Sequence, residues 1–87
     1  MNIKILGPGC INCERVEKLA KDVVGEMQID ATFDHVTQMD KIMKYPIMST
    51  PGLVINEEVV MSGRIPSKAE VTQFIINALA KEEQAAR

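Results

Sequence analysis

The sequence predicts an α/β fold of element order βαβαββα, a mixed four-stranded sheet with helices on both faces. A short β-prone run, a glycine-proline break and an amphipathic helical pattern open the chain. Two closely spaced apolar runs in the second half predict a hairpin, and a capped helical pattern follows them. Because strand–helix–strand crossovers are right-handed, the first two strands should be parallel, with the first helix packed across them.

The first strand and the first helix occupy the N-terminal third of the chain. Residues 3–6 make the β-prone run, and Gly7-Pro8-Gly9 ends it. The helix is expected to begin near Cys10 and to close with Gly25 and residues 27–30. Its apolar residues recur at helical spacing, as Val16, Leu19, Ala20, Val23, Val24 and Met27.

The middle of the chain predicts a second strand and a short helix. Residues 31–36 alternate polar and apolar side chains as a strand does. Thr37 followed by Asp40 resembles a capping box, which should start the helix. Pro46 ends it, because a proline disfavours helical geometry in the residue before it. A loop over residues 47–52 follows. One side of the helix carries Met39, Ile42 and Met43.

The second half of the chain predicts a hairpin and a last helix. The apolar runs 53–56 and 59–62 are close enough to pair through a tight turn. Ser67 and Glu70 form a capping box at the start of the helix. Residues 81–87 are charged and alanine-rich, which is typical of a fraying helix end. The buried stripe of this helix should contain Val71, Phe74, Ile75, Ala78 and Leu79.

Length and composition bound the class of protein. The 87 residues suffice for a single domain over residues 1–87. A formal net charge of −2 argues against nucleic acid as a partner, because phosphate binding needs a basic face. No apolar stretch approaches the ~20 residues of a membrane span, and the N-terminal apolar run is too short for a secretory signal. We therefore expect a cytoplasmic monomer without a bound metal or other cofactor.

Cys10 and Cys13 are the only two cysteines. In the cytoplasm a Cys-x-x-Cys pair is more often catalytic or metal-binding than structural. Helix placement makes the two thiols unequal. Cys10 should lie beside unsatisfied backbone N–H groups that favour a thiolate, and Cys13 should lie on the apolar face. Disulfide exchange requires this asymmetry, with one thiol to attack and one to resolve the mixed disulfide.

A family resemblance rests on three motifs that together span essentially the whole chain. They are similar to the thioredoxin fold and, within it, to the small bacterial and archaeal redox-active disulfide proteins. The resemblance implies a thiol–disulfide oxidoreductase acting on protein disulfides, recycled by an unidentified reductase. Cys10 would attack, Cys13 would resolve, and the two would form the redox-active disulfide. The motifs are Gly7-Pro8-Gly9-Cys10-Ile11-Asn12-Cys13, Thr50-Pro51-Gly52-Leu53-Val54 and Gly63-Arg64-Ile65-Pro66-Ser67.

The resemblance also implies a second half of the site. The third strand should neighbour the first, which brings Pro51 against the cysteine loop. In the family this proline is cis and presents the backbone of Thr50 to a partner peptide. Gly9 precedes the cysteine pair. Ile47 and Met48 flank the site and could form an apolar patch that docks a partner protein.

Other functions stay open at the level of sequence. The chain departs from thioredoxin at Gly9, at Ile11-Asn12 and at Lys4, where thioredoxin has a tryptophan, Gly-Pro and a buried acid. Two thiolates would also make a workable Cu(I) site, so a soft-metal carrier is an alternative. A third is a non-enzymatic docking module that keeps the fold for its peptide groove. His35 is expected to be an ordinary surface residue, and Met39 and Met43 are expected to pack in the core or at its rim.

Overall fold

The computed structural model describes residues 1–8, 11–47 and 49–85 of the chain. Its elements follow the predicted order βαβαββα. The strands form one mixed four-stranded sheet of order β2-β1-β3-β4, in which β1 and β2 are parallel and the other neighbours are antiparallel. The predicted fold class is therefore confirmed. The elements are β1 (Asn2–Leu6), α1 (Ile11–Met27), β2 (Thr32–Val36), α2 (Met39–Ile42), β3 (Gly52–Ile55), β4 (Glu58–Ser62) and α3 (Lys68–Ala85).

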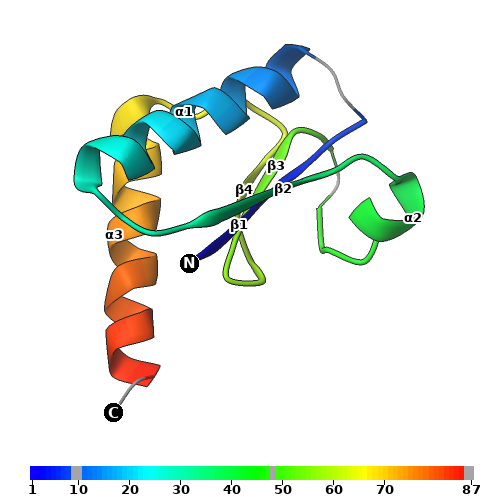
Figure 1. Cartoon of the computed structure of the whole chain (residues 1–87). Helices are drawn as coiled ribbons and strands as arrows, with labels where there is room; N and C mark the ends of the chain where they lie inside the picture. The colour runs from blue at the N-terminus through cyan, green and yellow to red at the C-terminus, as the bar shows by residue number, and fades with distance from the viewer. Residues whose placement is uncertain (9–10, 48, 86–87) are drawn as a thin grey trace.

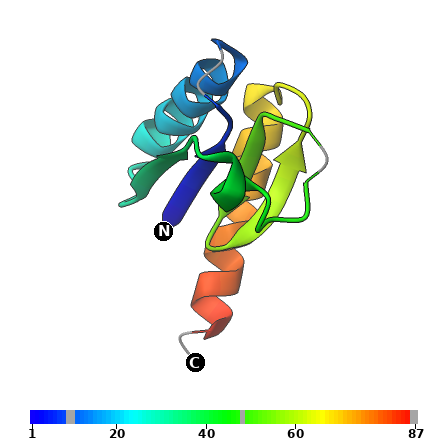
Figure 2. The same ribbon diagram turned by 90° about the vertical axis from the view of Figure 1, so that its right-hand side faces the viewer.

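The helices lie on two sides of the sheet. Helices α1 and α3 cover one face, and the single turn of α2 lies against the other (Figures 1 and 2). The central strands β1 and β3 contribute alternate side chains to the two faces, because successive residues of a strand point in opposite directions. Ile5, for example, packs towards α1 and α3, whereas the next residue, Leu6, packs towards α2.

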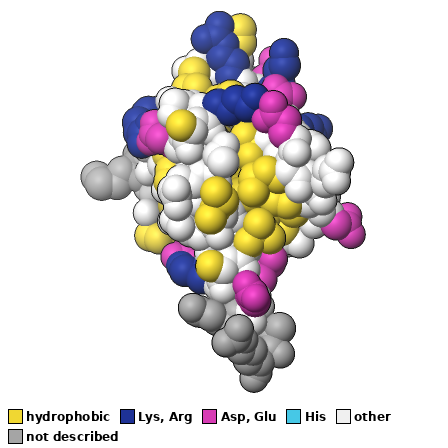
Figure 3. Space-filling view, turned by 90° about the vertical axis from the view of Figure 1, so that its left-hand side faces the viewer, with side chains coloured by type: hydrophobic (Ala, Val, Ile, Leu, Met, Phe, Trp, Pro, Cys, Tyr) yellow, Lys and Arg dark blue, Asp and Glu magenta, His cyan; other side chains and the backbone are white. Residues whose placement is uncertain are grey.

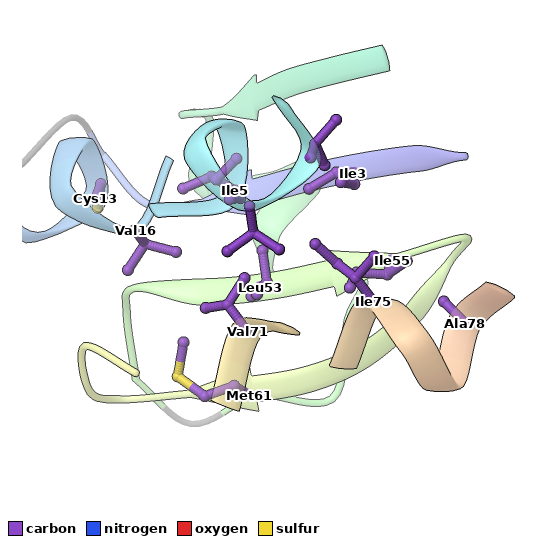
Figure 4. Packing of buried hydrophobic residues seen from close by; sticks show 13 residues of the cluster. Ile3, Ile5, Cys13, Val16, Leu53, Ile55, Met61, Val71, Ile75 and Ala78 are labelled. Carbon is purple, nitrogen blue, oxygen red and sulfur yellow. The ribbon is translucent and has the colours of Figure 1, made fainter. Parts of the chain in front are cut away.

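The larger apolar cluster lies between the sheet and the helix pair. Ile5 and Leu53 are paired in the β1–β3 register and are fully buried beneath Val16 of α1 and Val71 of α3 (Figure 4). Where α1 and α3 lie at the surface, partly covered apolar side chains gather at the rim of this cluster (Figure 3). The smaller cluster, under α2, contains Leu6, Ile42 and Val54.

Local turn chemistry sets several boundaries that differ from the prediction. The β3–β4 turn consists of Asn56 and Glu57, both in the left-handed region with φ of 51° and 65°. A two-residue hairpin turn of this kind needs φ > 0 at both central positions, so Glu58 becomes the first residue of β4. Within the β3–β4 pairing the register shifts between Leu53 and Val54, which is an irregularity of the β-bulge kind.

Capping boxes were predicted at the starts of α2 and α3, and only the one at α3 is correct. The capping box of α3 is confirmed, because Ser67 Oγ accepts from the Glu70 N–H and Glu70 Oε1 accepts from the Ser67 N–H, each at 3.2 Å. The box predicted at Thr37 is wrong: the N-cap of α2 is Gln38, and there is no side-chain capping hydrogen bond. Helix α3 continues through Ala85, and residues 86–87 lie outside the described part.

Candidate functional site

Cys13 lies in the first turn of α1 and is fully buried. It shares the apolar face of the helix with Val16 and belongs to the larger cluster (Figure 4). Cys13 therefore lies on the apolar face of the helix, as predicted. Cys10, Gly9 and Met48, which the sequence also assigns to the site, lie outside the described residues.

The Cys13 sulfur packs directly against the backbone of Gly7. A Cβ placed on Gly7 would overlap Cys13 Sγ and would lie 3.4 Å from Cys13 Cβ. The same point is 3.9 Å from the Cβ of Thr50. The end of β1, the start of α1 and the loop before β3 thus meet at one place, as the predicted strand order requires.

The Thr50-Pro51 pair is fixed by its neighbours on both sides. The peptide bond between these residues is cis, Pro51 is buried and Thr50 is half-buried. The Pro51 carbonyl accepts a 2.9 Å hydrogen bond from the Gly63 N–H, which follows β4. Gly63 has φ of +80°, and a Cβ there would overlap Ser49 Oγ. The loop before β3 and the residue after β4 are distant in sequence, and they are therefore in close contact next to Thr50.

An apolar hollow of about 340 Å³ borders Thr50 on the side of α2. Ile42 is 2% exposed, whereas Met39 and Met43 are 56% and 75% exposed. Of the two places predicted for these methionines, the core is therefore wrong, and both border the hollow beside buried Ile42. Helical spacing placed them on one side of α2, but a one-turn helix can bury only its innermost residue. The described residues of the lining carry no charge, and they are Met39, Ile42, Met43, Ile47, Ser49 and Thr50.

Comparison with known proteins decides the family. A sequence model of the thioredoxin domain matches residues 1–76. The chain belongs to the thioredoxin family. A thioredoxin of Methanothermobacter thermautotrophicus is 39% identical over 75 residues, which cover 86% of this chain and 97% of that protein. A thioredoxin of Methanocaldococcus jannaschii is 34% identical over 71 residues, which cover 82% of this chain and 81% of that protein.

Family membership supports a thiol–disulfide oxidoreductase-like role and confirms the recognition made from the three motifs. Lys4, where the sequence analysis noted a departure from the thioredoxin pattern, lies on the α2 side of the sheet, as Leu6 does. Its Nζ donates to the Tyr45 hydroxyl at 3.1 Å and pairs with the Glu57 carboxylate. Tyr45 also donates to Glu57 Oε2 at 3.1 Å, which closes a three-membered polar network.

The network shifts the pKa values of its own members. The hydrogen bond from Lys4, followed by that from Tyr45, lowers the pKa of the Glu57 carboxyl. The same bonds, with Glu57 contributing most, raise the pKa of Lys4 above its ordinary value. Both partners therefore stay charged at neutral pH. Among the described residues no charged side chain is fully buried.

His35 and a metal centre are the other candidates that the sequence raised. His35 is more buried than predicted: its side chain is 25% exposed, and Nδ1 lies 3.7 Å from Glu17 Oε2 on α1. Residues 1–8, 11–47 and 49–85 contain no cluster of three or more His, Cys, Asp or Glu side chains suited to a metal ion. Within those same ranges, no helix is long and apolar enough to cross a membrane.

Proposed function

We propose that this protein is a thiol–disulfide oxidoreductase that acts on protein disulfides through Cys10 and Cys13. The observation that carries the proposal is the burial of Cys13 at the start of α1, against Gly7 and beside the half-buried Thr50. The Cys13 thiol is thus protected from solvent and lies in the first turn of the helix. Cys10 immediately precedes Ile11, the first residue of α1. The unpaired N–H groups of the first turn favour negative charge there.

The proposed reaction proceeds in two exchange steps. The Cys10 thiolate attacks one sulfur of the partner disulfide, so that a Cys10–partner bond forms and the first partner thiolate leaves. The Cys13 thiolate then attacks the Cys10 sulfur, the Cys10–Cys13 disulfide forms and the second partner thiolate leaves. The partner gains two electrons and two protons, and this chain is oxidised. A separate reductase would return the pair to the dithiol state.

The partner would bind across the loop before β3. Half-buried Thr50 offers its backbone to an extended segment, which can pair with it as a short added strand. The hollow lined by Ile47, Met39 and Met43 has no charge among its described lining residues and borders Thr50, so it suits an apolar side chain of the partner. Gly9 and Met48 keep their proposed places in the site from the sequence alone. The cytoplasmic location and the monomeric state also stay predictions.

The decisive experiment traps the mixed disulfide. Reduced Cys13→Ser protein, incubated with an oxidised peptide that carries one disulfide, should accumulate a covalent adduct through Cys10, detected as a mass increase under non-reducing conditions. The wild-type protein should show no lasting adduct, because Cys13 resolves it. The control Cys10→Ser/Cys13→Ser should form none. Absence of an adduct from Cys13→Ser, or stoichiometric Cu(I) binding by a wild-type protein that cannot cycle between dithiol and disulfide, would refute the proposal.

A further inference from the structure

Gly7 is the residue after β1, and its surroundings leave no room for a side chain. A Cβ at this position would fall on Cys13 Sγ, with Cys13 Cβ 3.4 Å away. The next nearest atom, Thr50 Cβ at 3.9 Å, is at an ordinary contact distance. The volume that any other residue would fill at position 7 is therefore occupied by the sulfur of the second cysteine.

The backbone gives no other reason for glycine here. Gly7 is not among the glycines with positive φ, so an L-residue would meet no conformational penalty. Its N–H donates a 2.9 Å hydrogen bond to the Val36 carbonyl, continuing the β1–β2 pairing, and an alanine would keep this donor. Overlap with Cys13 is thus the main conflict that a Cβ at position 7 would create.

We infer that Gly7 is a positioning residue for Cys13: by lacking a Cβ it lets the resolving sulfur lie against the end of β1, on the side of Thr50. This inference rests on the proposed function, because it assigns Gly7 to the second exchange step. An added methyl group would force the sulfur to rotate away or shift the first turn of α1. Formation of the Cys10–Cys13 bond depends on the position of that sulfur, whereas the first attack by Cys10 does not.

The test separates the two steps with an aromatic disulfide reagent, dithiobis(nitrobenzoate), which releases one coloured thiolate at each step. In reduced wild-type protein the first release reports attack by Cys10, and the second reports resolution by Cys13. In Gly7→Ala the first rate should stay within about twofold, and the second should fall by about tenfold to a hundredfold, the range expected for a displaced reacting atom. The matched control is Gly25→Ala in α1, where a Cβ meets nothing within 4 Å, and both of its rates should equal wild type.

Each outcome has one meaning. A wild-type protein that never releases the second thiolate contradicts the proposed function itself, whatever Gly7 does. A wild-type protein with two releases, together with a Gly7→Ala variant whose rates are unchanged or equally slowed, overturns the role of Gly7 alone. An equal slowing of both steps would indicate a general structural effect.

A stability measurement covers the case in which Gly7→Ala folds poorly. Removing the sulfur with Cys13→Ala should remove the conflict, so that adding Gly7→Ala to that variant leaves the denaturation midpoint unchanged or higher. In the presence of Cys13 the same substitution should lower the midpoint. Equal losses in the two backgrounds would show no coupling between Gly7 and Cys13 and would overturn the inference.

Discussion

Gly63, the residue after β4, packs against the loop that contains Ser49, Thr50 and Pro51. Its φ of +80° lies in the left-handed region, and a Cβ there would overlap Ser49 Oγ. Gly63→Ala should therefore destabilise the protein by about 1–2 kcal/mol, through the cost of left-handed backbone in an L-residue and the contact with Ser49. Chemical denaturation measures this change. Ser49→Gly in the same chain should restore the part caused by contact, but not the part caused by the backbone.

The opposite result is expected at Gly25, within α1. Alanine there meets open space and gains about 0.5–1 kcal/mol of helix stability over glycine. If Gly63→Ala were as stable as Gly25→Ala, the left-handed conformation at position 63 would not be a constraint on the fold.

The residues of the site differ in how far the sequence could reveal them. Burial of Cys13 follows from helical spacing with Val16, which is local information. The approach of Thr50 follows from strand order, which the crossover rule supplies. The tight contact at Gly7 has no local signal, because glycine before a proline reads equally well as a simple loop residue. Helical spacing predicted that Met39 and Met43 pack in the core or at its rim, but spacing does not reveal that α2 is only one turn long.

The C-terminus of α1 offers a second test, at the scale of a secondary-structure element. Gln28 follows the helix with φ of 55°, the Ile29 N–H donates to the Val24 carbonyl at 3.0 Å and the Gln28 N–H to the Gly25 carbonyl at 3.3 Å. This is the Schellman arrangement, in which glycine is the favoured residue at the left-handed position. Gln28→Gly should stabilise the protein by about 0.5–1 kcal/mol and raise the thermal midpoint.

Gln38 provides the matched control for this prediction. It is also exposed and flanks a helix, but its φ of −80° and ψ of 126° suit any residue. Gln38→Gly should gain nothing and should lose stability through added flexibility of the unfolded chain. An identical response of the two positions would mean that backbone strain at Gln28 is negligible.

The N-terminus of α3 should make stability depend on pH. The Arg64 guanidinium, which donates to both oxygens of Glu70, and the backbone N–H of Ser67 lower the pKa of the Glu70 carboxyl to about 2. A carboxyl with a lowered folded-state pKa stabilises the fold above its ordinary pKa of 4.5 and loses that contribution as the pH falls to about 2. Glu70→Gln should therefore be less stable than wild type at neutral pH, and the difference should shrink through this window.

Thermal midpoints of both proteins across that pH range measure the effect. Glutamine can still accept from the Ser67 N–H, so the variant removes mainly the charge. Glu57, whose pKa is also lowered, is present in both proteins and cancels in the difference. Glu83→Gln, on the exposed side of the same helix, is the control. A difference between wild type and Glu70→Gln that stays constant down to pH 2 would contradict the prediction.

The elements illustrate which boundaries a sequence can reveal. The box of Ser67 and Glu70 was predictable because its partners are three residues apart and a long apolar stripe follows them. The box at Thr37 failed because α2 is too short to be held by its own caps and follows the packing of Ile42 instead. The turn at Asn56 and Glu57 was misplaced by one residue because its left-handed conformations are imposed by strand pairing, not by glycine.

At the scale of the whole molecule, the sheet separates two apolar clusters of unequal size. Helices α1 and α3, with Cys13, belong to the larger one, and α2 belongs to the smaller one with Leu6 and Val54 (Figures 1 and 2). The loop that ends at Thr50 is attached to the smaller cluster through Ile47. The proposed cysteine chemistry and the proposed partner docking would thus be supported by different apolar clusters, which predicts that they can be uncoupled.

Truncation on the two sides of the sheet tests this separation. Ile75→Ala removes a fully buried side chain from the larger cluster and should cost about 2–5 kcal/mol of global stability. Ile42→Ala truncates the only buried residue of α2, and a single helical turn cannot persist without its packing. We therefore expect local opening of residues 38–47 before the sheet unfolds. Amide hydrogen exchange should show lost protection in that segment for Ile42→Ala, and a more uniform loss for Ile75→Ala.

Reaction rates give a second readout of the same two variants. Below the unfolding transition, Ile42→Ala should react normally with a small aromatic disulfide but more slowly with a folded protein disulfide. Ile75→Ala should keep the wild-type ratio of the two rates. Equal protection patterns and equal rate ratios in the two variants would contradict this separation. They would show that the smaller cluster under α2 opens together with the larger cluster, as one cooperative unit.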